Sequence, residues 1–326
     1  MYYRYWSRHF INLLQTSYMI RYILTLLTIS YCMIVKAQYV EPDFAKNVST
    51  EKEPVLHRVP VLPDSFRVFG ERVPLEIWDV RERFDRELLI NTYLHGTSLY
   101  ILKLYTRWMP MIENKLKENN VPDDFKFLCV AESALQNAIS RAGATGFWQF
   151  MRGSAPGYGL EVNNEIDERY NVEKATDAAC RYLKDAYDKF GNWTAAAASY
   201  NCGMGGYSNA AGAQGTNDYY KLLLPEETMR YIFRIMALKQ ILEHPEQSGY
   251  DISINEQYSP LDTKRVVINN AIPDLVKFAN ENGTDYKTLK LLNPWLRSNK
   301  LTNRYKKSYT LLLPNENGQF AISNGQ

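Results

Sequence analysis

The pattern of hydrophobic and polar residues predicts a largely helical chain. Between residues 75 and 119, apolar side chains recur every three or four positions in two successive stretches, as they do on one face of an amphipathic helix. Pro110 lies in the second stretch, where we expect it to break or kink the helix. Residues 38–74 are rich in Pro, Glu, Lys and Val without a sustained period, and they are interpreted as a linker and lead-in.

The helical pattern continues from residue 110 to residue 245, and no β-type run interrupts it. Pro122 marks one helix start, Thr176 is a candidate N-cap for another helix, and Pro225 marks a third start. The predicted helices span residues 125–132, 177–190, 194–200 and 225–242. The glycine-rich segment 141–151 is expected to be loop, so this region is predicted to be all-α.

After Pro245 the pattern changes to a short βααβ unit. The predicted elements are strands at residues 266–268 and 309–313 and helices at 273–282 and 286–292. The unit has its own set of apolar positions, so we expect a chain that ends near Gly249 to fold without it. From Tyr258 onward the chain carries ten basic and five acidic side chains.

The composition is that of a globular chain with room for two domains. Of 326 residues, 45% are hydrophobic and 23% are charged, which excludes a disordered, collagen-like or disulfide-scaffold protein. The net charge of +2 and the absence of a dominant basic run argue against a nucleic-acid partner. Aromatic residues reach 13%; their flat amphipathic rings suit sugar stacking, although most of them belong in a core.

The first 37 residues have the pattern of a secretory signal peptide. They contain four basic residues and no acid, with a largely apolar run over residues 22–35 and small residues before a cut after Ala37. The run is shorter than the ~20 residues that span a bilayer, but a retained membrane anchor is the alternative. Met19 is a candidate start, and a lipoprotein signal at Cys32 is disfavoured by the bulky residue before it. Cleavage would leave 34 basic and 36 acidic side chains.

Cys129, Cys180 and Cys202 remain after such a cut. They are scattered over apolar or small-residue helical segments and do not form a disulfide framework, so we expect them to stay unpaired even in an oxidising compartment. The four histidines lie far apart, and the chain has neither C-x-x-C nor H-x-x-x-H spacing. No metal site is therefore expected, and no cofactor.

Glu132 is an ionisable residue within an apolar stripe. It follows Phe125 by seven positions, in phase with Leu128 and Leu135. Burial among apolar neighbours raises the pKa of a carboxyl and keeps it protonated near neutral pH, as a general acid for glycosidic cleavage requires. A structural role fits the same pattern, with Glu132 paired to a buried Arg or Tyr or turned towards solvent.

Five short segments follow one another in a characteristic order. They are Glu132-Ser133, SRAGATGFWQFM at 140–151, DERY at 167–170, ASYNCG at 198–203 and LPEET at 224–228. In this order and spacing they resemble the soluble lytic transglycosylase (SLT) domain, in the form found in the membrane-bound D type, over roughly residues 110–242. The resemblance implies a lysozyme-like α fold that cleaves the MurNAc–GlcNAc β-1,4 bond of peptidoglycan.

The resemblance also implies the residues of the site. Glu132 matches the family's catalytic glutamate, and the implied substrate-binding residues are Ser133, Ser140, Gln149, Tyr200, Asn201 and Glu227. Tyr200 matches the tyrosine placed against the catalytic carboxyl, and Glu227 the glutamate of a Leu-Pro-x-Glu-Thr segment. Structural alternatives are turn capping and loop packing for Ser140 and Gln149, a core position for Tyr200, and a favourable helix N-terminus for Glu227.

The motif set supplies a single central carboxyl. Ordinary glycosidases need two, ~5 Å or ~6.5–9.5 Å apart. In the family's chemistry one glutamate protonates the glycosidic oxygen and then removes the proton from the C6 hydroxyl, which attacks C1 and leaves a 1,6-anhydro sugar. The alternatives are a goose-type lysozyme-like hydrolase on the same fold, with Asp167 as a water-positioning acid, and an inactive peptidoglycan-binding wall protein.

The C-terminal unit resembles a LysM module through residues 272–275, 289–294 and 312–314. The usual Gly-Asp-Thr after the first strand is replaced by Asn269-Asn270-Ala271, in a loop that helps to form the family's glycan groove. Glycan binding and a structural remnant therefore both fit the module.

Taken together, the sequence pattern and the resemblances predict the domain boundaries, the partner and the cellular location of the protein. The predicted parts are a signal peptide (1–37), a linker and lead-in (38–74), a helical extension (75–109), a lytic transglycosylase catalytic domain (110–245) and a LysM-like module (258–315). The implied partner is the glycan strand of peptidoglycan, with possible membrane or wall association. The implied location is the periplasm or cell envelope of a bacterium.

Overall fold

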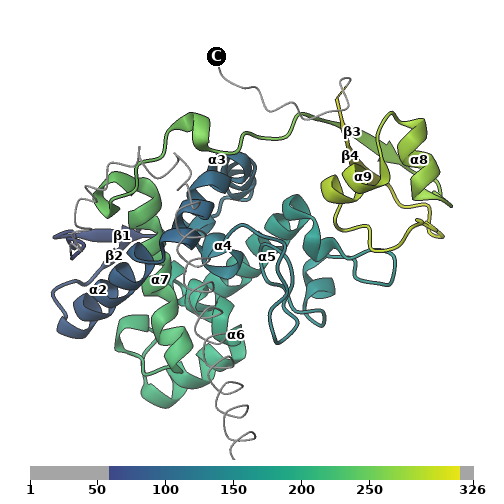
Figure 1. Ribbon diagram of the computed structural model, residues 1–326. Helices are drawn as coiled ribbons and strands as arrows, with labels where there is room; N and C mark the ends of the chain where they lie inside the picture. Colours follow the sequence, from purple (N-terminus) through teal and green to yellow (C-terminus); the bar gives the residue numbers. More distant parts are fainter. Residues whose placement is uncertain (1–58, 316–326) are drawn as a thin grey trace, which may run out of the picture. The chain divides into compact units, whose positions relative to one another are not determined.

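The computed structural model describes residues 59–315 (Figure 1). The predicted signal peptide and the first part of the predicted linker lie outside these residues. In the described part the chain is mostly helical, with eight α-helices and two small antiparallel sheets, which confirms the predicted mainly α class. None of the described helices combines the length and the apolar character needed to cross a bilayer.

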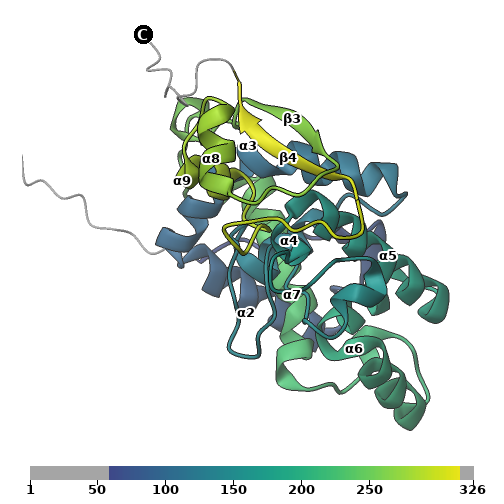
Figure 2. The same ribbon diagram turned by 90° about the vertical axis from the view of Figure 1, so that its right-hand side faces the viewer.

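Among residues 59–315, six helices precede the C-terminal module. They are α2 (Trp78–Thr92), α3 (His95–Glu118), α4 (Phe125–Ser133), α5 (Val172–Phe190), α6 (Trp193–Gln214) and α7 (Glu226–Glu243). Short 3₁₀ turns span Ala155–Tyr158, Glu168–Tyr170, Tyr219–Lys221, Pro245–Ser248 and Ile254–Glu256. α2 and α4 pack on α7, while α5 packs on α6 and α3. Figures 1 and 2 both show α4 and α7 between α2 and α5.

α4 is the most deeply buried helix because its apolar residues cover more than one face. Phe125, Phe127 and Leu128 are inaccessible to solvent. The one lysine of this helix, Lys126, is also buried, and its amine lies 2.7 Å from Glu113 Oε1 and 2.6 Å from a carboxylate oxygen of the Asp123 side chain. Because the charge is paired, the burial of this amine is tolerated.

Two helices begin at asparagine caps that the sequence pattern did not single out. α5 begins at Val172, where Asn171 Oδ1 accepts from the backbone N–H of Lys174, so the predicted cap at Thr176 is wrong. Thr176 instead lies inside α5, with its hydroxyl bonded to Trp148 Nε1 at 2.8 Å. α6 begins after Asn192 and extends well beyond the predicted residues 194–200, with a break at Gly203, whose φ of 77° is not helical.

The helix α3 runs through Pro110 and does not end there, so of the predicted break or kink the break is wrong. Met109 and Ile112, on either side of the proline, are buried in the core. We attribute the continuity of the helix to this packing, which offsets the backbone hydrogen bond that a proline cannot make.

The end of the predicted lead-in forms a β-hairpin. β1 (Phe66–Val68) pairs with β2 (Glu71–Val73), and Phe69 in the turn stacks on Phe125 of α4 with ring centroids 4.3 Å apart. Glu71 accepts hydrogen bonds from two backbone N–H groups at the start of α6. The hairpin therefore belongs to the helical core, because its turn supplies an aromatic side chain and its second strand a helix cap.

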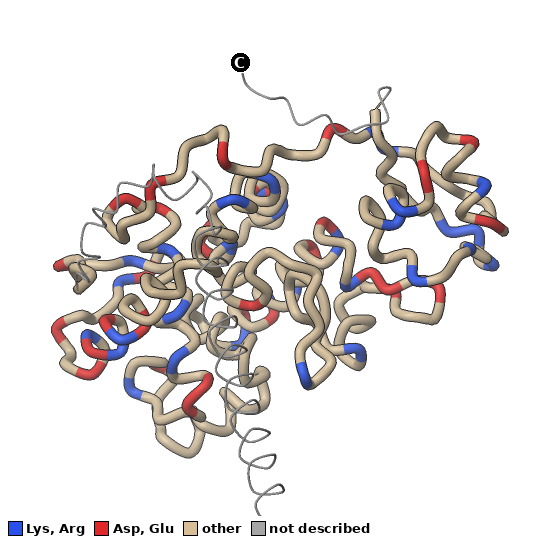
Figure 3. The backbone as a smooth tube through the Cα atoms, viewed as in Figure 1, with Lys and Arg blue, Asp and Glu red and all other residues tan. Residues whose placement is uncertain are grey.

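The C-terminal module has the predicted βααβ order. Its elements are β3 (Thr263–Ile268), α8 (Leu275–Glu281), α9 (Tyr286–Leu292) and β4 (Tyr309–Pro314). The strands pair antiparallel, from Thr263 opposite Pro314 to Ile268 opposite Tyr309. Figure 3 shows that basic residues are distributed over the whole module and do not gather in one run.

The module does not have an apolar core entirely of its own, and in this respect the prediction was wrong. Ile166 and Tyr170, from the segment before α5, are buried in the same cluster as the leucines of the module. Sequence periodicity could not reveal this, because the two residues lie about a hundred positions upstream.

The three described cysteines are free thiols, as predicted. Cys129 and Cys180 are buried, and Cys202 is half-buried.

Candidate active site

Glu132 lies in the last turn of α4, at the edge of the buried core. The helix ends after Ser133 because Ala134 and Leu135 adopt left-handed φ values of 51° and 59°. Such values are costly for residues with a Cβ, and the complete burial of the Leu135 side chain offsets the cost. The sharp turn leaves Glu132 half-buried at the end of the helix.

Tyr231 of α7 donates a hydrogen bond from its hydroxyl to Oε1 of Glu132. Burial raises the pKa of Glu132 to about 7, although the Tyr231 bond and the charge of Arg234 lower it in part, and the charge of Glu227 adds to the increase. The raised pKa agrees with the prediction from the apolar stripe, and the tyrosine partner of the structural alternative is also present. Near neutral pH the carboxyl can therefore both donate and accept a proton.

Tyr200 of α6 lies within electrostatic reach of Glu132. Burial, and then the charge of Glu132, raise the pKa of Tyr200 well above its ordinary value. Its hydroxyl donates to the carbonyl oxygen of Trp148 at 2.7 Å, and its ring packs edge-on against Tyr182 with centroids 5.0 Å apart. In this structure the hydroxyl therefore holds the loop that follows α4, and the hydrogen bond to Glu132 comes from Tyr231.

Ser140 and Gln149 lie on a loop that returns on itself after α4. Bridges join Ile139 to Thr145 and Thr145 to Phe150. The hydroxyl of Ser140 accepts from a backbone N–H within the loop, and Nε2 of Gln149 donates to Gly146 O at 2.8 Å. Both side chains thus have the turn-capping roles of the structural alternative, and their predicted sugar contacts stay predictions.

Ser133 and Asn201 also make internal hydrogen bonds. The buried hydroxyl of Ser133 donates to Cys129 O, one turn earlier in α4, at 3.3 Å. Oδ1 of Asn201 accepts from the Thr228 hydroxyl at 2.8 Å, which ties α6 to the first turn of α7. Glu227 lies beside Thr228 and is exposed. This arrangement brings the predicted segments around residues 200 and 227 together.

Asp167, the acid that a hydrolase would use, is buried in an ion pair. Both of its carboxylate oxygens are occupied by Arg169, at 2.9 Å from Nε and 2.7 Å from Nη2. The two side chains are only 8% and 6% exposed. A carboxylate held in this fork is not free to orient a water molecule.

Sequence reasoning missed two residues around Glu132. Tyr231 lies one helical turn after Glu227, on the same side of α7, and Arg234 follows a further turn along. The spacing of Tyr231 from Glu227 was a usable signal. The family segment 224–228 placed the start of this helix near the Glu132 carboxyl, and a buried tyrosine hydroxyl needs a hydrogen-bond partner. Read alone, Tyr231 is indistinguishable from a core aromatic residue.

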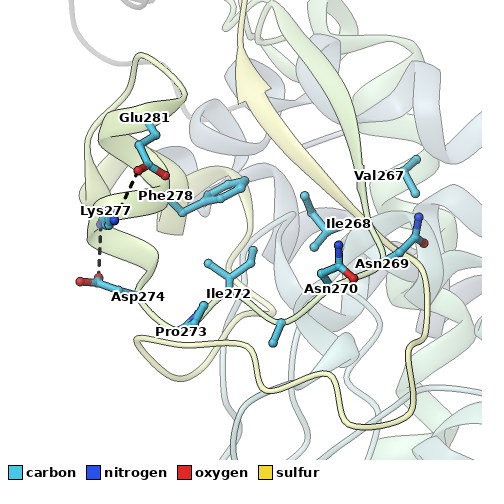
Figure 4. Close-up of a pocket in the computed structure, with 11 residues that line it drawn as sticks. Val267, Ile268, Asn269, Asn270, Ile272, Pro273, Asp274, Lys277, Phe278 and Glu281 are labelled. Atoms are coloured by element: carbon cyan, nitrogen blue, oxygen red, sulfur yellow. Dashed lines mark hydrogen bonds and ion pairs between the residues drawn. The ribbon is translucent and has the colours of Figure 1, made fainter.

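The module carries a pocket of about 520 Å³ beside α8. It is lined by the segment from Val267 to Asp274, which includes the unusual Asn269-Asn270-Ala271 sequence, and by Lys277, Phe278 and Glu281. Figure 4 shows Phe278 pointing from α8 towards Ile268 and Asn270. A lining that combines apolar side chains with the amides of Asn269 and Asn270 is suited to a sugar or peptide ligand.

Within residues 59–315, no group of three or more His, Cys, Asp or Glu side chains is arranged to hold a metal ion.

Comparison with known proteins supports two domains. Residues 109–223 match the family model of the transglycosylase SLT domain, and residues 264–317 match the soluble lytic transglycosylase C-terminal LysM-like domain. Two curated relatives, from Escherichia coli strain K12 and from Escherichia coli O6:H1 strain CFT073, are both named membrane-bound lytic murein transglycosylase D. Each is 29% identical over 229 residues, which cover 68% of this chain and 49% of the relative. The chain thus spans about half the length of the curated relatives it matches. These matches confirm the predicted resemblance: the chain carries a region similar to the transglycosylase SLT domain, followed by a region similar to the C-terminal LysM-like domain of soluble lytic transglycosylases.

Proposed function

We propose that this protein is a peptidoglycan lytic transglycosylase of the bacterial cell envelope. It cleaves the MurNAc–GlcNAc β-1,4 bond without water and leaves 1,6-anhydroMurNAc ends. The observation that carries the proposal is the Glu132 carboxyl, whose pKa of about 7 suits both an acid and a base. The SLT-domain match and the names of the curated relatives support the same activity.

In the proposed mechanism Glu132 acts twice. Protonated, it donates to the glycosidic oxygen as the bond to C1 breaks, and the charge that develops at C1 is supported by the N-acetyl group of the substrate. As a carboxylate, it removes the proton from the C6 hydroxyl, whose oxygen attacks C1 within the same sugar. The hydrogen bond from Tyr231 stabilises the carboxylate between the two steps.

The hydrolase alternative lacks support from its second carboxyl. Asp167 is engaged on both oxygens by Arg169 and is buried. Glu227 is exposed at the start of α7, where its charge reaches Glu132 but no contact joins the two. A single proton-transfer residue is sufficient when the nucleophile belongs to the substrate, so the transglycosylase reaction fits this site better.

Six further residues are proposed to contact the glycan, as in the family. They are Ser133, Ser140, Gln149, Tyr200, Asn201 and Glu227. Of these, Ser140 and Glu227 are exposed, and Gln149 is half-buried at the loop surface. Ser133 and Asn201 in addition make internal hydrogen bonds, from Ser133 to Cys129 O within α4 and from the Thr228 hydroxyl of α7 to Asn201.

The experiment that tests the reaction uses purified sacculi digested in ¹⁸O-labelled water. The expected product is an unlabelled anhydro sugar, one water lighter than a hydrolytic product. Glu132→Gln keeps the shape but removes the transferable proton, and turnover is expected to fall ~10²–10⁴-fold or further. Glu226→Gln, an exposed glutamate of the α7 start, is the matched control and should retain activity. Label at a reducing MurNAc end would establish hydrolysis instead.

We also propose that the LysM-like module binds glycan strands through its pocket. Phe278 supplies an apolar face, and Asn269 and Asn270 supply the polar groups that the usual Gly-Asp-Thr loop would otherwise provide. Phe278→Ala should reduce retention on insoluble peptidoglycan. Val276→Ala, on the exposed part of α8 outside the pocket, should not reduce it. Equal retention of both variants would favour the structural remnant.

A further inference from the structure

The segment from Glu161 to Tyr170 of the SLT domain makes non-covalent contacts with the LysM-like module. It precedes α5 and belongs to the SLT domain by sequence, yet its backbone pairs with the module. The N–H of Asp167 donates to Trp295 O at 2.8 Å, and Glu165 O accepts from the Arg297 N–H at 2.7 Å. Ile166 forms a bridge with Leu296 between these two bonds. This is a regular strand-like pairing, which a loose surface contact would not produce.

The side chains of this segment are also directed to the module. The carboxylate of Glu165 accepts from the backbone N–H of Thr302 at 2.7 Å and from its hydroxyl at 2.5 Å. These hydrogen bonds hold the pKa of Glu165 below its ordinary value. Glu161 accepts from Lys307 Nζ at 2.9 Å and from the Tyr309 hydroxyl at 3.1 Å.

The contact buries apolar surface as well as polar groups. Ile166 is 3% exposed and Tyr170 is 7% exposed, within the core of the module. The guanidinium of Arg297 lies over the Tyr170 ring, 4.3 Å from its centroid. Partly exposed ion pairs contribute little, so the buried side chains and the backbone bonds supply most of the attachment.

The same segment reaches the loop that carries Ser140 and Gln149. Arg169, oriented by its fork with Asp167, donates from Nη1 to Gly143 O at 3.3 Å and to Phe150 O at 3.1 Å. One of these carbonyl groups precedes Gly146 in the loop and the other follows it. At Gly146, between them, a Cβ atom would come within 2.0 Å of the Arg169 carbonyl oxygen, so the loop backbone lies directly on this residue.

We propose that the LysM-like module is docked on the SLT domain and positions the loop of Ser140 and Gln149 through Asp167 and Arg169. The inference rests on the proposed function for the role of the loop, but the docking itself does not. Arg169 is a positioning residue, because it contacts the loop backbone and is not proposed to contact the sugar. In this arrangement, the module and the region that carries Glu132 are held in contact. A chain that ends near Gly249 would expose Ile166 and Tyr170.

Hydrogen exchange of the full chain tests the docking without any need for activity. In Ile166→Asp a charge replaces the buried side chain at the centre of the contact. The backbone amides of Thr145 and Gln149 are hydrogen-bonded within the loop, and we expect their exchange to accelerate at least tenfold. Val276→Asp is the matched control, because it places the same charge on an exposed position of α8 that lies outside the pocket. Unchanged exchange of the loop amides in Ile166→Asp would overturn the proposal.

A second variant separates positioning from a general loss of folding. Arg169→Lys keeps the charge but loses the fork and the two carbonyl contacts. We expect KM for soluble glycan fragments to rise about tenfold, with a smaller change in kcat, while a single cooperative thermal unfolding transition shows that the variant still folds. An unchanged KM would overturn the positioning role. If the wild-type chain shows no lytic activity at all, the proposed function fails, whereas the exchange experiment still decides whether the module is docked.

Discussion

The hydroxyl of Tyr231 and Oε1 of Glu132 are joined by a hydrogen bond that connects α7 to α4. Both residues lie on helices whose packing is fixed by the core, since Tyr231 is buried and α4 packs directly on α7. The donor is therefore in place before a substrate binds. Because a phenol donates more strongly to a carboxylate than to a neutral carboxyl, the bond favours the charged form of Glu132 and lowers its pKa from the value that burial alone would give.

Replacing Tyr231 by Phe is expected to raise the pKa of Glu132 above about 7. The first step needs the protonated acid, so activity falls as the pH rises through this pKa, and the alkaline limb of kcat/KM should move to higher pH. The maximal rate should fall roughly 10- to 100-fold, because the carboxylate formed in the first step loses a preorganised donor. A pH–rate profile on soluble glycan fragments measures both effects.

Tyr200→Phe is the control for this variant. Its hydroxyl bonds to Trp148 O and not to Glu132, so its loss should leave the alkaline limb nearly in place even if the rate falls. An alkaline limb that moves equally in both variants would contradict the assignment of the hydrogen bond to Tyr231.

Glu132 should also make the folded protein less stable as the pH rises. The pKa of this carboxyl is about 7 in the folded state, against 4.5 as its ordinary value. Between these values the folded chain holds a proton that the unfolded chain has released, so the free energy of unfolding decreases with increasing pH in this window and levels off above it. At about 1.4 kcal/mol per pKa unit, Glu132→Gln should gain about 3 kcal/mol on the wild type between pH 4.5 and 7. Urea unfolding of both proteins across this range tests the sign; parallel curves would contradict it.

The fold was predictable where it depends on local pattern. The helices that contain Glu132, Tyr182 and Tyr231 were found from periodicity, because each buries one face against its neighbours. The break predicted at Pro110 does not occur, because tertiary packing maintains a helix that local preference would end. The cap at Asn171 was missed since Thr176, a few residues later, carries an equally suitable side chain.

The site was predictable only in part, for a related reason. Glu132 is visible as a charged residue in an apolar stripe, and the ordered family segments brought in Tyr200 and Glu227. The donor on Glu132 and the insertion of Ile166 into the module core depend on which helices and loops meet in space. The hydrophobic periodicity of a single segment does not show which other segments it contacts, so these two features could be found only from the three-dimensional structure.

The three described thiols should be unreactive in the folded protein. Burial raises the pKa of Cys180 to about 12 and that of Cys129 well above its ordinary value, and it also raises the pKa of the half-buried Cys202. At pH 8 the thiolate, which is the reactive form, is therefore scarce. Alkylation followed by peptide mass mapping should show little labelling of the folded protein and labelling of all three thiols after unfolding. As denaturant is added, Cys202 should be the first to be labelled, because it is only half-buried. A quantitative disulfide between any two of them would contradict this prediction.

The ion pair between Glu87 and Arg230 should be essential for the packing of α2 on α7. Arg230 Nε lies 2.6 Å from Glu87 Oε1, and the Glu87 side chain is only 2% exposed. Within residues 59–315, the second carboxylate oxygen of Glu87 has no hydrogen-bond partner. Arg230→Ala would therefore leave a buried carboxylate without its counter-charge, which is strongly destabilising. We expect a loss of about 3 kcal/mol in the free energy of unfolding, at the low end of the usual range because Arg230 is itself partly exposed.

Arg72→Ala is the control for Arg230→Ala, because it breaks an ion pair that is exposed instead of buried. Arg72 and Glu76 form an ion pair at a similar distance, 2.8 Å, but their side chains are 65% and 58% exposed. Its removal should change the free energy of unfolding far less than Arg230→Ala does, because both ions keep their water. Arg230 also precedes Tyr231, so a shift of α7 in Arg230→Ala should disturb the hydrogen bond to Glu132 and lower activity, whereas Arg72→Ala should retain it. Equal stability of the two variants in urea unfolding would mean that the buried carboxylate of Glu87 is relieved in another way and that α7 is not held in place by this pair.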